Sequence, residues 1–222
     1  MKREIMTTGD GSKTIHMPDL NEQYHSKHGA LQEALHVFIE MGMKPMLESH
    51  KDSSKLNISE FGFGTGLNAM HTAQFPTEVQ INYTGIEAFP VTAEELEAMN
   101  YGELLNDPDL FQQLHNTEWE NWSPITNDFH LLKHQSKFEY LQGSGDQDLI
   151  YFDAFGPRTQ PELWTVDIFK ICYSMLKTGG FLTTYCAQGQ ARRNMIAAGF
   201  EVERLPGPPG KREMLRAVKV GR

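Results

Sequence analysis

The sequence predicts an α/β fold built on a doubly wound, mostly parallel sheet, with an N-terminal β-hairpin annex and a C-terminal antiparallel hairpin. Three observations support this prediction. Strand-like and helix-like patterns alternate from residue 55 onward, which is typical of successive βαβ units. Residues 148–153 are apolar throughout their middle, as a strand covered on both faces requires. The loop 206–210 is too short for a crossover helix, so the last two strands must be antiparallel.

The first fifty residues precede this alternation and form the predicted annex. Two β-prone runs within residues 5–17 flank Asp10-Gly11, a hairpin signal because glycine readily adopts a positive φ. Apolar residues then recur at helical spacing, which predicts a helix over residues 28–39 or slightly beyond. The polar residues 51–55 form a surface loop. We therefore expect a single domain over 1–222, with the hairpin and helix annex in 1–50 and a Rossmann-like core in 51–222.

Local signals set the expected elements of the core. Thr92 and Glu95 form a capping-box pattern, and Asp107-Pro108 is a helix-start signal. Pro161 is expected to begin a helix that Gly179-Gly180 ends. The other expected helices are 67–74, 92–99, 107–114 and 190–198. The expected strands are 56–61, 79–87, 129–132, 148–153, 181–185, 200–205 and 213–220.

The composition of the 222 residues is that of an ordinary globular protein, with 39% hydrophobic and 22% charged residues. No apolar run approaches the ~18 residues of a membrane helix, and no apolar signal core follows the N-terminus. The two cysteines, Cys172 and Cys186, do not form a CxxC pair, which argues against a disulfide framework and a structural zinc site. We therefore expect a cytoplasmic protein that does not associate with a membrane.

Charge is unevenly distributed along the chain. The net charge of −9 argues against a general nucleic-acid coat. Residues 192–222, however, contain eight Lys and Arg against three acidic residues, a net charge of +5, which leaves −14 for the residues before them. This basic segment is either a solvated surface or a face that approaches an anionic partner.

A glycine-rich loop, Glu60-Phe61-Gly62-Phe63-Gly64-Thr65-Gly66, joins the first core strand to its helix. Ligands of open α/β folds bind at the carboxyl edge of the sheet, where such loops lie, and glycines let a ligand approach the backbone. A dinucleotide fingerprint would place its third glycine at residue 67, which is Leu67. The G-x-G-x-G spacing, with an acid two residues ahead of it, resembles motif I of the class I S-adenosylmethionine-dependent methyltransferases.

Two more acidic residues end strands at the same predicted edge. Glu87 follows the last glycine of the loop by 21 residues, a position from which a carboxylate can bind both hydroxyls of an adenosine ribose. Asp153 ends the most apolar strand, where a carboxylate could orient or deprotonate an amine that attacks a methyl group. The structural alternatives are a solvated glutamate at a strand end and an aspartate that caps a loop or helix.

Four sequence blocks resemble the methyltransferase module of the MnmC-type enzymes, which methylate the aminomethyl group of 5-aminomethyl-2-thiouridine at the tRNA wobble position. The blocks are 24–33 (YHSKHGALQE), 60–68 (EFGFGTGLN), 153–157 with 161–164 (DAFGP and PELW), and 210–215 (GKREML). They are collinear from the hairpin to the last strand and so extend over nearly the whole chain. The resemblance implies a class I methyltransferase fold, S-adenosylmethionine as cofactor and tRNA as partner.

The same resemblance implies roles for individual residues. Asp153 is the implied catalytic residue, facing the transferred methyl group and the uridine amine. The implied cofactor-binding residues are Tyr24, Ser26, Gly29, Glu60, Gly62, Gly64, Gly66 and Glu87. The implied substrate-binding residues are Phe155, Lys211 and Arg212, of which the last two lie near the RNA.

Two features depart from the family pattern. Lys133-His134-Gln135 stand where the family usually has Gly-Asp, whose acid contacts the adenine side. The sequence also lacks the flavin oxidase module of the bifunctional enzymes, so we expect it only to methylate and a separate enzyme to generate the amine.

Three other functions remain open. They are a methyltransferase for a small-molecule or protein amine, a nicotinamide-dependent oxidoreductase, and a catalytically silent binding module. No metal site is expected, because His25, His28 and His36 lack carboxylates and thiols at metal-binding spacing. Trp119 and Trp122 are expected to pack in the core or a lid rather than to stack on bases.

Overall fold

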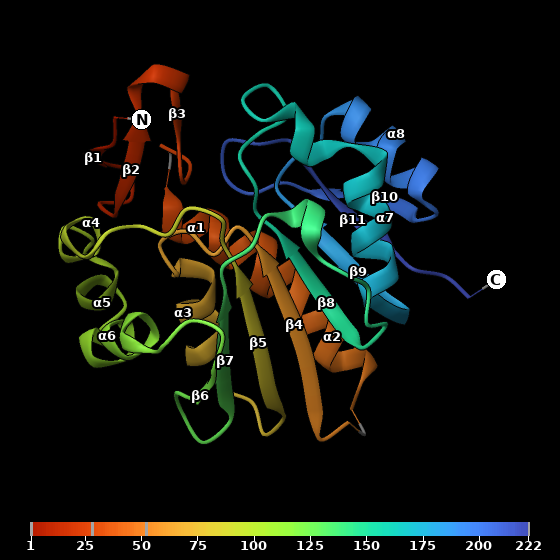
Figure 1. Ribbon diagram of the computed structural model, residues 1–222, viewed down its shortest axis with the longest axis horizontal. Helices are drawn as coiled ribbons and strands as arrows, with labels where there is room; N and C mark the ends of the chain where they lie inside the picture. Colours follow the sequence, from red (N-terminus) through yellow and green to blue (C-terminus); the bar gives the residue numbers. More distant parts are fainter. Residues whose placement is uncertain (1, 28, 52, 222) are drawn as a thin grey trace.

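The computed structural model describes residues 2–27, 29–51 and 53–221 and contains a large sheet of eight strands (Figure 1). The predicted start of a helix at His28, the polar loop at Asp52 and the basic Arg222 include positions outside the described residues. The sheet order is β10-β11-β9-β8-β4-β5-β7-β6. Its strands are β4 (Lys55–Phe61), β5 (Gln80–Ile86), β6 (Trp122–Pro124), β7 (Phe129–His134), β8 (Gln147–Phe152), β9 (Leu176–Thr184), β10 (Glu201–Pro206) and β11 (Glu213–Val218).

The strand order confirms the predicted doubly wound topology. Strands β4, β5, β7, β8 and β9 are parallel, whereas β11 pairs antiparallel with both β9 and β10. The chain runs outward from β4 through β5 to β7 and then returns to β8 on the other side of β4. The switch point therefore lies between β4 and β8, and the carboxyl ends of these two strands are where an open α/β fold binds its ligand.

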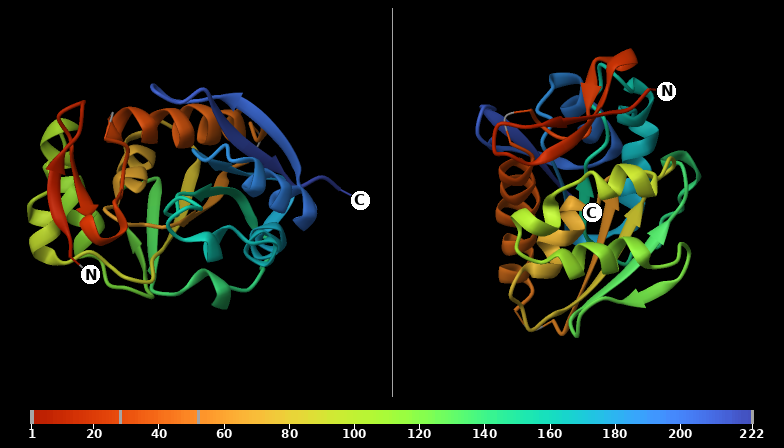
Figure 2. Two further views of the ribbon diagram at one scale, coloured as in Figure 1. Left: turned by 90° about the horizontal axis from the view of Figure 1, so that it is seen from above. Right: turned by 90° about the vertical axis from the view of Figure 1, so that its left-hand side faces the viewer.

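Two hydrophobic clusters cover the two faces of the sheet, and β8 contributes to both. Leu149 and Tyr151 belong to one cluster and Ile150 and Phe152 to the other, as the alternation of side chains along a strand requires. The first face is covered by the helical residues 30–49 and by α3, and the second by α7 and α8 (Figure 2). The helices are α1 (Ala30–Ala34), the π-helical η2 (Leu35–Met43), α2 (Lys44–Ser49), α3 (Leu67–Gln74), α4 (Ala93–Glu97), α5 (Tyr101–Leu104), α6 (Pro108–Asn116), α7 (Val166–Met175) and α8 (Gly189–Ala198).

The N-terminal residues form a small separate sheet of β1 (Glu4–Thr7), β2 (Lys13–Met17) and β3 (Glu22–Gln23). β1 and β2 pair antiparallel across Asp10-Gly11, with Ile5 opposite Ile15, which confirms the predicted hairpin. This sheet lies beyond the carboxyl ends of the central strands (Figure 1). The N-terminal sheet is thereby placed over the edge at which the switch point opens.

Several predicted boundaries are wrong, each for a local reason. The first helical segment continues past Ile39 to Ser49 because η2 uses π-type bonding ahead of Pro45, which has no N–H to donate. Residues 161–164 form only a 3-10 turn, and α7 begins after a new cap at Thr165. Gly179-Gly180 lie inside β9 rather than ending a helix.

Short elements were also missing from the prediction, namely β3, α5 and the edge strand β6. The prediction for Trp122 is wrong, because its side chain is exposed on β6. Trp119 does pack inward, against Phe63 of the glycine loop.

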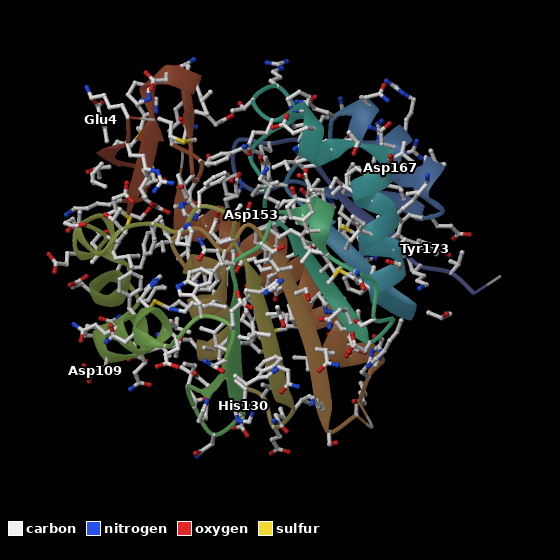
Figure 3. The ribbon with its side chains drawn as sticks, in the orientation of Figure 1. Glu4, Asp109, His130, Asp153, Asp167 and Tyr173 are labelled. Carbon is white, nitrogen blue, oxygen red and sulfur yellow. The ribbon has the colours of Figure 1, made fainter. Side chains whose placement is uncertain are left out.

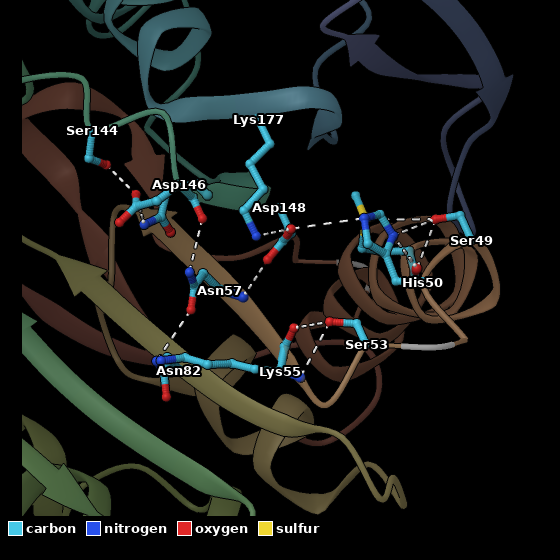
Figure 4. Close-up of polar contacts among 12 residues, drawn as sticks. Ser49, His50, Ser53, Lys55, Asn57, Asn82, Ser144, Asp146, Asp148 and Lys177 are labelled. Atoms are coloured by element: carbon cyan, nitrogen blue, oxygen red, sulfur yellow. Dashed lines mark hydrogen bonds and ion pairs between the residues drawn. The ribbon is translucent and has the colours of Figure 1, made fainter.

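At the amino end of the central strands, Asp148 is held by structural partners (Figure 4). Lys177 Nζ donates to Asp148 Oδ1 at 2.6 Å, and the backbone N–H of Asn57 donates to Asp148 Oδ2 at 2.8 Å. The carboxylate is buried and joins β4, β8 and the start of β9. None of the helices in the described part of the chain is both long and apolar enough to cross a membrane.

Candidate active site

A cavity of about 930 Å³ opens at the carboxyl edge of the sheet, between the central strands and the N-terminal sheet. Asp153 lies at this end of the strands, and His130 lies at the opposite end (Figure 3). The predicted site residues that line the cavity are Tyr24, Gly62, Gly64, Glu87, Asp153 and Phe155. The topology thus brings together residues that are far apart in sequence.

The glycine loop turns sharply after β4. The N–H groups of Gly62 and Phe63 both donate to Ile86 O at 3.0 Å, which ties the loop to the end of β5. Gly62 has a φ of +99°, and a Cβ there would lie 2.7 Å from the Asp153 carbonyl oxygen. Only glycine fits at this position, because the two strand ends of the switch point meet there.

Glu87 follows β5 and lies against the glycine loop. Its Oε2 accepts from the Gly64 N–H at 3.0 Å, and its Oε1 accepts from the Phe89 N–H at 2.9 Å. The carboxylate is therefore oriented at the cavity wall by backbone groups from both sides. An oriented carboxylate in this place can accept hydrogen bonds from a diol such as a ribose.

Asp153 follows β8 and belongs to a buried polar network. Asn68 Nδ2 donates to Asp153 Oδ2 at 2.8 Å and to Glu60 Oε1 at 2.7 Å. Tyr83 donates its hydroxyl hydrogen to Glu60 Oε2 at 2.8 Å. Burial raises the pKa of Asp153 to about 7, against a usual value near 3.8. It also raises the pKa of Glu60 well above its usual value, although Tyr83 and Asn68 oppose the shift.

Aromatic side chains and the N-terminus form the wall opposite the strands. Tyr24 packs edge-on against Phe155, with ring centroids 5.0 Å apart, and a Cβ on Gly64 would lie 3.2 Å from the Tyr24 ring. Arg3 donates to Glu95 Oε2 at 2.9 Å and to Phe89 O at 3.2 Å. These contacts join the residue before β1 to the loop after β5 and to α4, so that both segments enclose the cavity.

Lys211 and Arg212, adjacent in sequence, occupy different environments. Lys211 forms an ion pair with Glu33 of α1, and its Nζ lies 4.1 Å from the centroid of the Tyr185 ring. Tyr185 in turn donates to Ala154 O at 2.9 Å, which places this group beside the Asp153 loop. The Arg212 side chain is 92% exposed. Of these two residues, Arg212 is the one presented to solvent, with a long contact of 3.9 Å between its Nε and Glu213 Oε1.

Three further cations of the basic segment are engaged within the chain, whereas Arg193 is exposed and donates to the neutral Gln190. Arg216 pairs with Glu203 at 2.7 Å and Arg204 with Glu213 at 3.3 Å, while Lys219 donates to two backbone carbonyls of residues 173 and 176. Part of the +5 charge read from the sequence is therefore paired within the chain.

Four predicted cofactor residues do not line the cavity as the structure describes it: Ser26, Gly29, Glu60 and Gly66. Gly29 donates to Ser26 O at 3.1 Å and lies against Asp10, so both belong to the connection into α1. Gly66 begins α3 in a left-handed conformation. Glu60 lies behind the glycine loop in the network with Asn68.

His134 and Gln135 contact the Glu120 carboxylate, whereas the Lys133 side chain is directed toward α6. Glu120 accepts from His134 Nδ1 at 2.6 Å and from the Gln135 N–H at 2.7 Å. Lys133 is buried and donates to His115 O at 2.7 Å, and burial lowers its pKa to about 8. The cavity wall on this side is instead formed by Lys137, Phe138 and Glu139.

Sequence reasoning missed several of the residues that form the cavity. Asn68 lies within the block 60–68, but the resemblance implies no role for it. Arg3, Lys137, Phe138 and Glu139 also line the cavity and carry no local motif, and Glu95, which lines it too, was identified only as part of a capping box. Among the described residues there is no cluster of three or more metal-ligating side chains.

Comparison with known protein sequences finds similarity to methyltransferases and to MnmC proteins. Residues 112–220 match the family described as S-adenosyl-L-methionine-dependent methyltransferase. A protein of Cupriavidus metallidurans named "tRNA 5-methylaminomethyl-2-thiouridine biosynthesis bifunctional protein MnmC" is 32% identical over 95% of this chain. The protein of the same name from Aeromonas salmonicida is 29% identical over 91% of it. The chain spans 33% of the length of each of these relatives.

Solved structures agree with this at the level of the fold. The crystal structure of MNMC2 from Aquifex aeolicus matches with a TM-score of 0.74 and 22% identity, covering 100% of this chain and 71% of that one. A spermidine synthase from Thermotoga maritima matches with a TM-score of 0.54 and 13% identity, covering 100% of this chain and 72% of that one. The predicted fold class and the resemblance are therefore confirmed. Nearly the whole chain is related to a segment that makes up about one third of the length of each MnmC protein.

Proposed function

We propose that this chain is an S-adenosylmethionine-dependent methyltransferase that methylates the aminomethyl group of 5-aminomethyl-2-thiouridine at the tRNA wobble position. One observation carries the proposal: the glycine loop, Glu87 and Asp153 line a single cavity at the switch point of the sheet. The names of the relatives supply the substrate class, since they refer to biosynthesis of the methylated nucleoside.

The residues present fit this cofactor. At Gly64 the φ is +50° and a Cβ would lie 3.2 Å from the Tyr24 ring, so glycine is favoured at this turn of the cavity wall. Glu87 offers an oriented carboxylate for ribose hydroxyls. Ser26, Gly29, Glu60 and Gly66 would act indirectly, by shaping the wall. When bound, S-adenosylmethionine supplies an electrophilic methyl group on a sulfonium sulfur.

Asp153 would act on the amine. An amine attacks only through a free lone pair, so its nitrogen must be neutral and correctly oriented. A carboxylate with a pKa of about 7 is a suitable acceptor for the proton that the nitrogen loses near neutral pH. Phe155 and Tyr24, which pack together at the cavity wall, would limit the orientations that the substrate can adopt.

RNA would approach this opening through few charges. Arg212 is the exposed cation of the β10–β11 connection, and we assign it to a phosphate contact, since phosphate contacts position a nucleic acid. Lys211 is held by Glu33 and would contact RNA only after leaving that ion pair.

Mass spectrometry of nucleosides tests this function. The protein is incubated with S-adenosylmethionine and tRNA that carries the aminomethyl group, and the tRNA is then digested. We expect the wobble nucleoside to gain the mass of one methylene group, with no change in tRNA that lacks the aminomethyl group. Absence of the product with a protein that binds S-adenosylhomocysteine would reject tRNA as the substrate.

The pairing of the C-terminal cations favours a second candidate, methylation of a small-molecule or protein amine in the same cavity. Arg204, Arg216 and Lys211 are neutralised within the chain, which weakens the attraction of RNA to this side. Polyamines and lysine peptides in place of tRNA distinguish the two candidates. Methylation of these amines, with tRNA left unmodified, would favour the second.

A further inference from the structure

Asn68 connects two carboxyl groups that belong to different strand ends. It is the second residue of α3, it is 2% exposed, and it lines the cavity. Its single amide nitrogen donates to Glu60 Oε1 at 2.7 Å and to Asp153 Oδ2 at 2.8 Å. Both amide hydrogens are thereby used, one for the residue that follows β8 and one for a residue of β4.

The orientation of this amide has a cost. Asn68 Oδ1 is buried and has no hydrogen-bond partner in the described part of the structure. A buried polar atom without a partner is unfavourable, whereas hydrogen bonds to ionised groups are stronger than neutral ones. The opposite orientation would direct a carbonyl oxygen at two carboxyl groups. The two hydrogen bonds that Asn68 Nδ2 donates therefore determine the orientation of the amide, despite the cost of the unpartnered Oδ1.

Glu60 is held independently on its other side. Tyr83 donates to Glu60 Oε2 at 2.8 Å, and Tyr83 and Glu60 are both buried. Both oxygens of Glu60 thus accept a hydrogen bond, one from Asn68 and one from Tyr83. Glu60 is thereby fixed in place, and it holds the Asn68 amide nitrogen in reach of Asp153.

We infer that Asn68 is a positioning residue that couples Glu60 to Asp153: anchored by Glu60, its amide donates a hydrogen bond that orients the Asp153 carboxylate toward the cavity and favours its ionised form. The inference deepens the proposed function, because it gives the methyl-transfer site a support that acts through Asp153. It also gives Glu60, the acid ahead of the glycine loop, a role that involves no contact with the cofactor.

Other charged groups also face Asp153. Glu33 of α1 raises the pKa of Asp153, and Lys211, which precedes β11, lowers it. The Tyr185 hydroxyl donates to the carbonyl oxygen of Ala154, the residue after Asp153. Glu33 and Lys211 form an ion pair with each other, so their effects on Asp153 largely cancel. Asn68 is the partner in direct contact, and its removal should dominate any change.

Asn68→Ala removes the bridge, with Tyr83→Phe as the matched control that loses only the outer contact to Glu60. Infrared spectra of the carboxyl region, recorded against pH on the ligand-free protein, follow the ionisation of Asp153, which Asp153→Asn identifies. We expect Asn68→Ala to move this midpoint upward by about one pH unit, as the loss of one charge-assisted hydrogen bond would do. Tyr83→Phe should leave it nearly in place.

The catalytic arm uses the same variants with tRNA substrate. We expect Asn68→Ala to lower kcat roughly 10-fold, to shift its pH profile upward by the same amount, and to leave the KM for tRNA and the affinity for S-adenosylhomocysteine unchanged. Should Asn68→Ala not fold, Asn68→Ser, which keeps one donor, replaces it and is expected to give a smaller shift in the same direction.

Two results would overturn the inference. An unchanged Asp153 midpoint in the infrared titration would show that Asn68 does not act on Asp153. A loss of S-adenosylhomocysteine affinity with an unchanged midpoint would assign Asn68 to the cofactor instead. Because the infrared titration needs neither tRNA nor cofactor, it decides the coupling even if the wild-type protein methylates no tRNA.

Discussion

The two ends of β8 each carry an aspartate, and the two have opposite surroundings. Asp148, at the amino end, is neutralised by Lys177 and a backbone N–H (Figure 4). Asp153, at the carboxyl end, lines a cavity, receives one amide donor and has a pKa raised to about 7. The comparison teaches that burial alone does not mark a functional carboxylate. A carboxylate whose charge is left uncompensated beside a cavity is available for chemistry.

The largest expected difference between the two aspartates is in catalysis. Asp153→Asn keeps the shape and the acceptor for Asn68 but removes the proton acceptor, so methyl transfer should fall ~10²-fold. Asp148→Asn should leave the rate per folded molecule unchanged. Single-turnover methylation of tRNA, with binding of S-adenosylhomocysteine as the folding control, measures both. Equal rates for wild type and Asp153→Asn would break the comparison.

Cofactor binding should separate the two ends of the sheet in the same way. Glu87→Ala removes a carboxylate that the Gly64 and Phe89 amides orient, and it should weaken S-adenosylhomocysteine binding by about 1–3 kcal/mol. Titration calorimetry of Glu87→Ala and Asp148→Asn gives the two values. If Asp148→Asn weakened binding as much as Glu87→Ala does, the loss would reflect general destabilisation.

Stability should change with opposite signs at the two ends. A carboxyl group with a raised pKa binds its proton more tightly when folded, so its burial lowers stability as pH rises from about 4 through about 7. Asp153→Asn should therefore stabilise the fold at pH 8, by on the order of 2 kcal/mol, and make little difference below pH 4. Asp148→Asn should destabilise it by about 1–3 kcal/mol at pH 8, because Lys177 loses its partner. Urea denaturation at both pH values checks the signs, and destabilisation by Asp153→Asn at pH 8 would refute the account.

The smallest expected effects are on tRNA binding and involve Lys211 and Arg212. They test whether a cation that is paired within the chain also contacts RNA. Arg212→Ala should reduce the salt slope of tRNA binding by about one unit. Lys211→Met should instead change the pH profile of methylation through Glu33 and Asp153, with a smaller change in slope. Lys170→Ala, which removes an exposed lysine on α7, is the control for a general effect of charge. An unchanged slope in Arg212→Ala would require RNA to dock elsewhere.

The sequence was sufficient where neighbouring residues determine the structure. Asp10-Gly11, the capping box at Thr92 and the apolar run before Asp153 all gave the correct element. The convergence of Glu87 and Asp153 followed from the rule that parallel strands end at one edge.

Long-range contacts could not be predicted in this way. The pairing of Lys211 with Glu33 and of Arg3 with Glu95 joins segments from opposite parts of the chain, and no local pattern announces either. The helix predicted to end at Ile39 or slightly beyond continues to Ser49 through π-type bonding. Charge counts therefore showed a basic C-terminal segment but not which of its cations are paired within the chain, whereas the strand-end motifs pointed to residues that line the cavity.

A crystal structure with S-adenosylhomocysteine tests most directly whether the carboxyl-edge cavity is one cofactor and methyl-transfer site. The account predicts that the ribose hydroxyls bind Glu87 and that the sulfur faces the cavity beside Asp153. Binding outside the cavity, or binding within it with the sulfur turned away from Asp153, would contradict it.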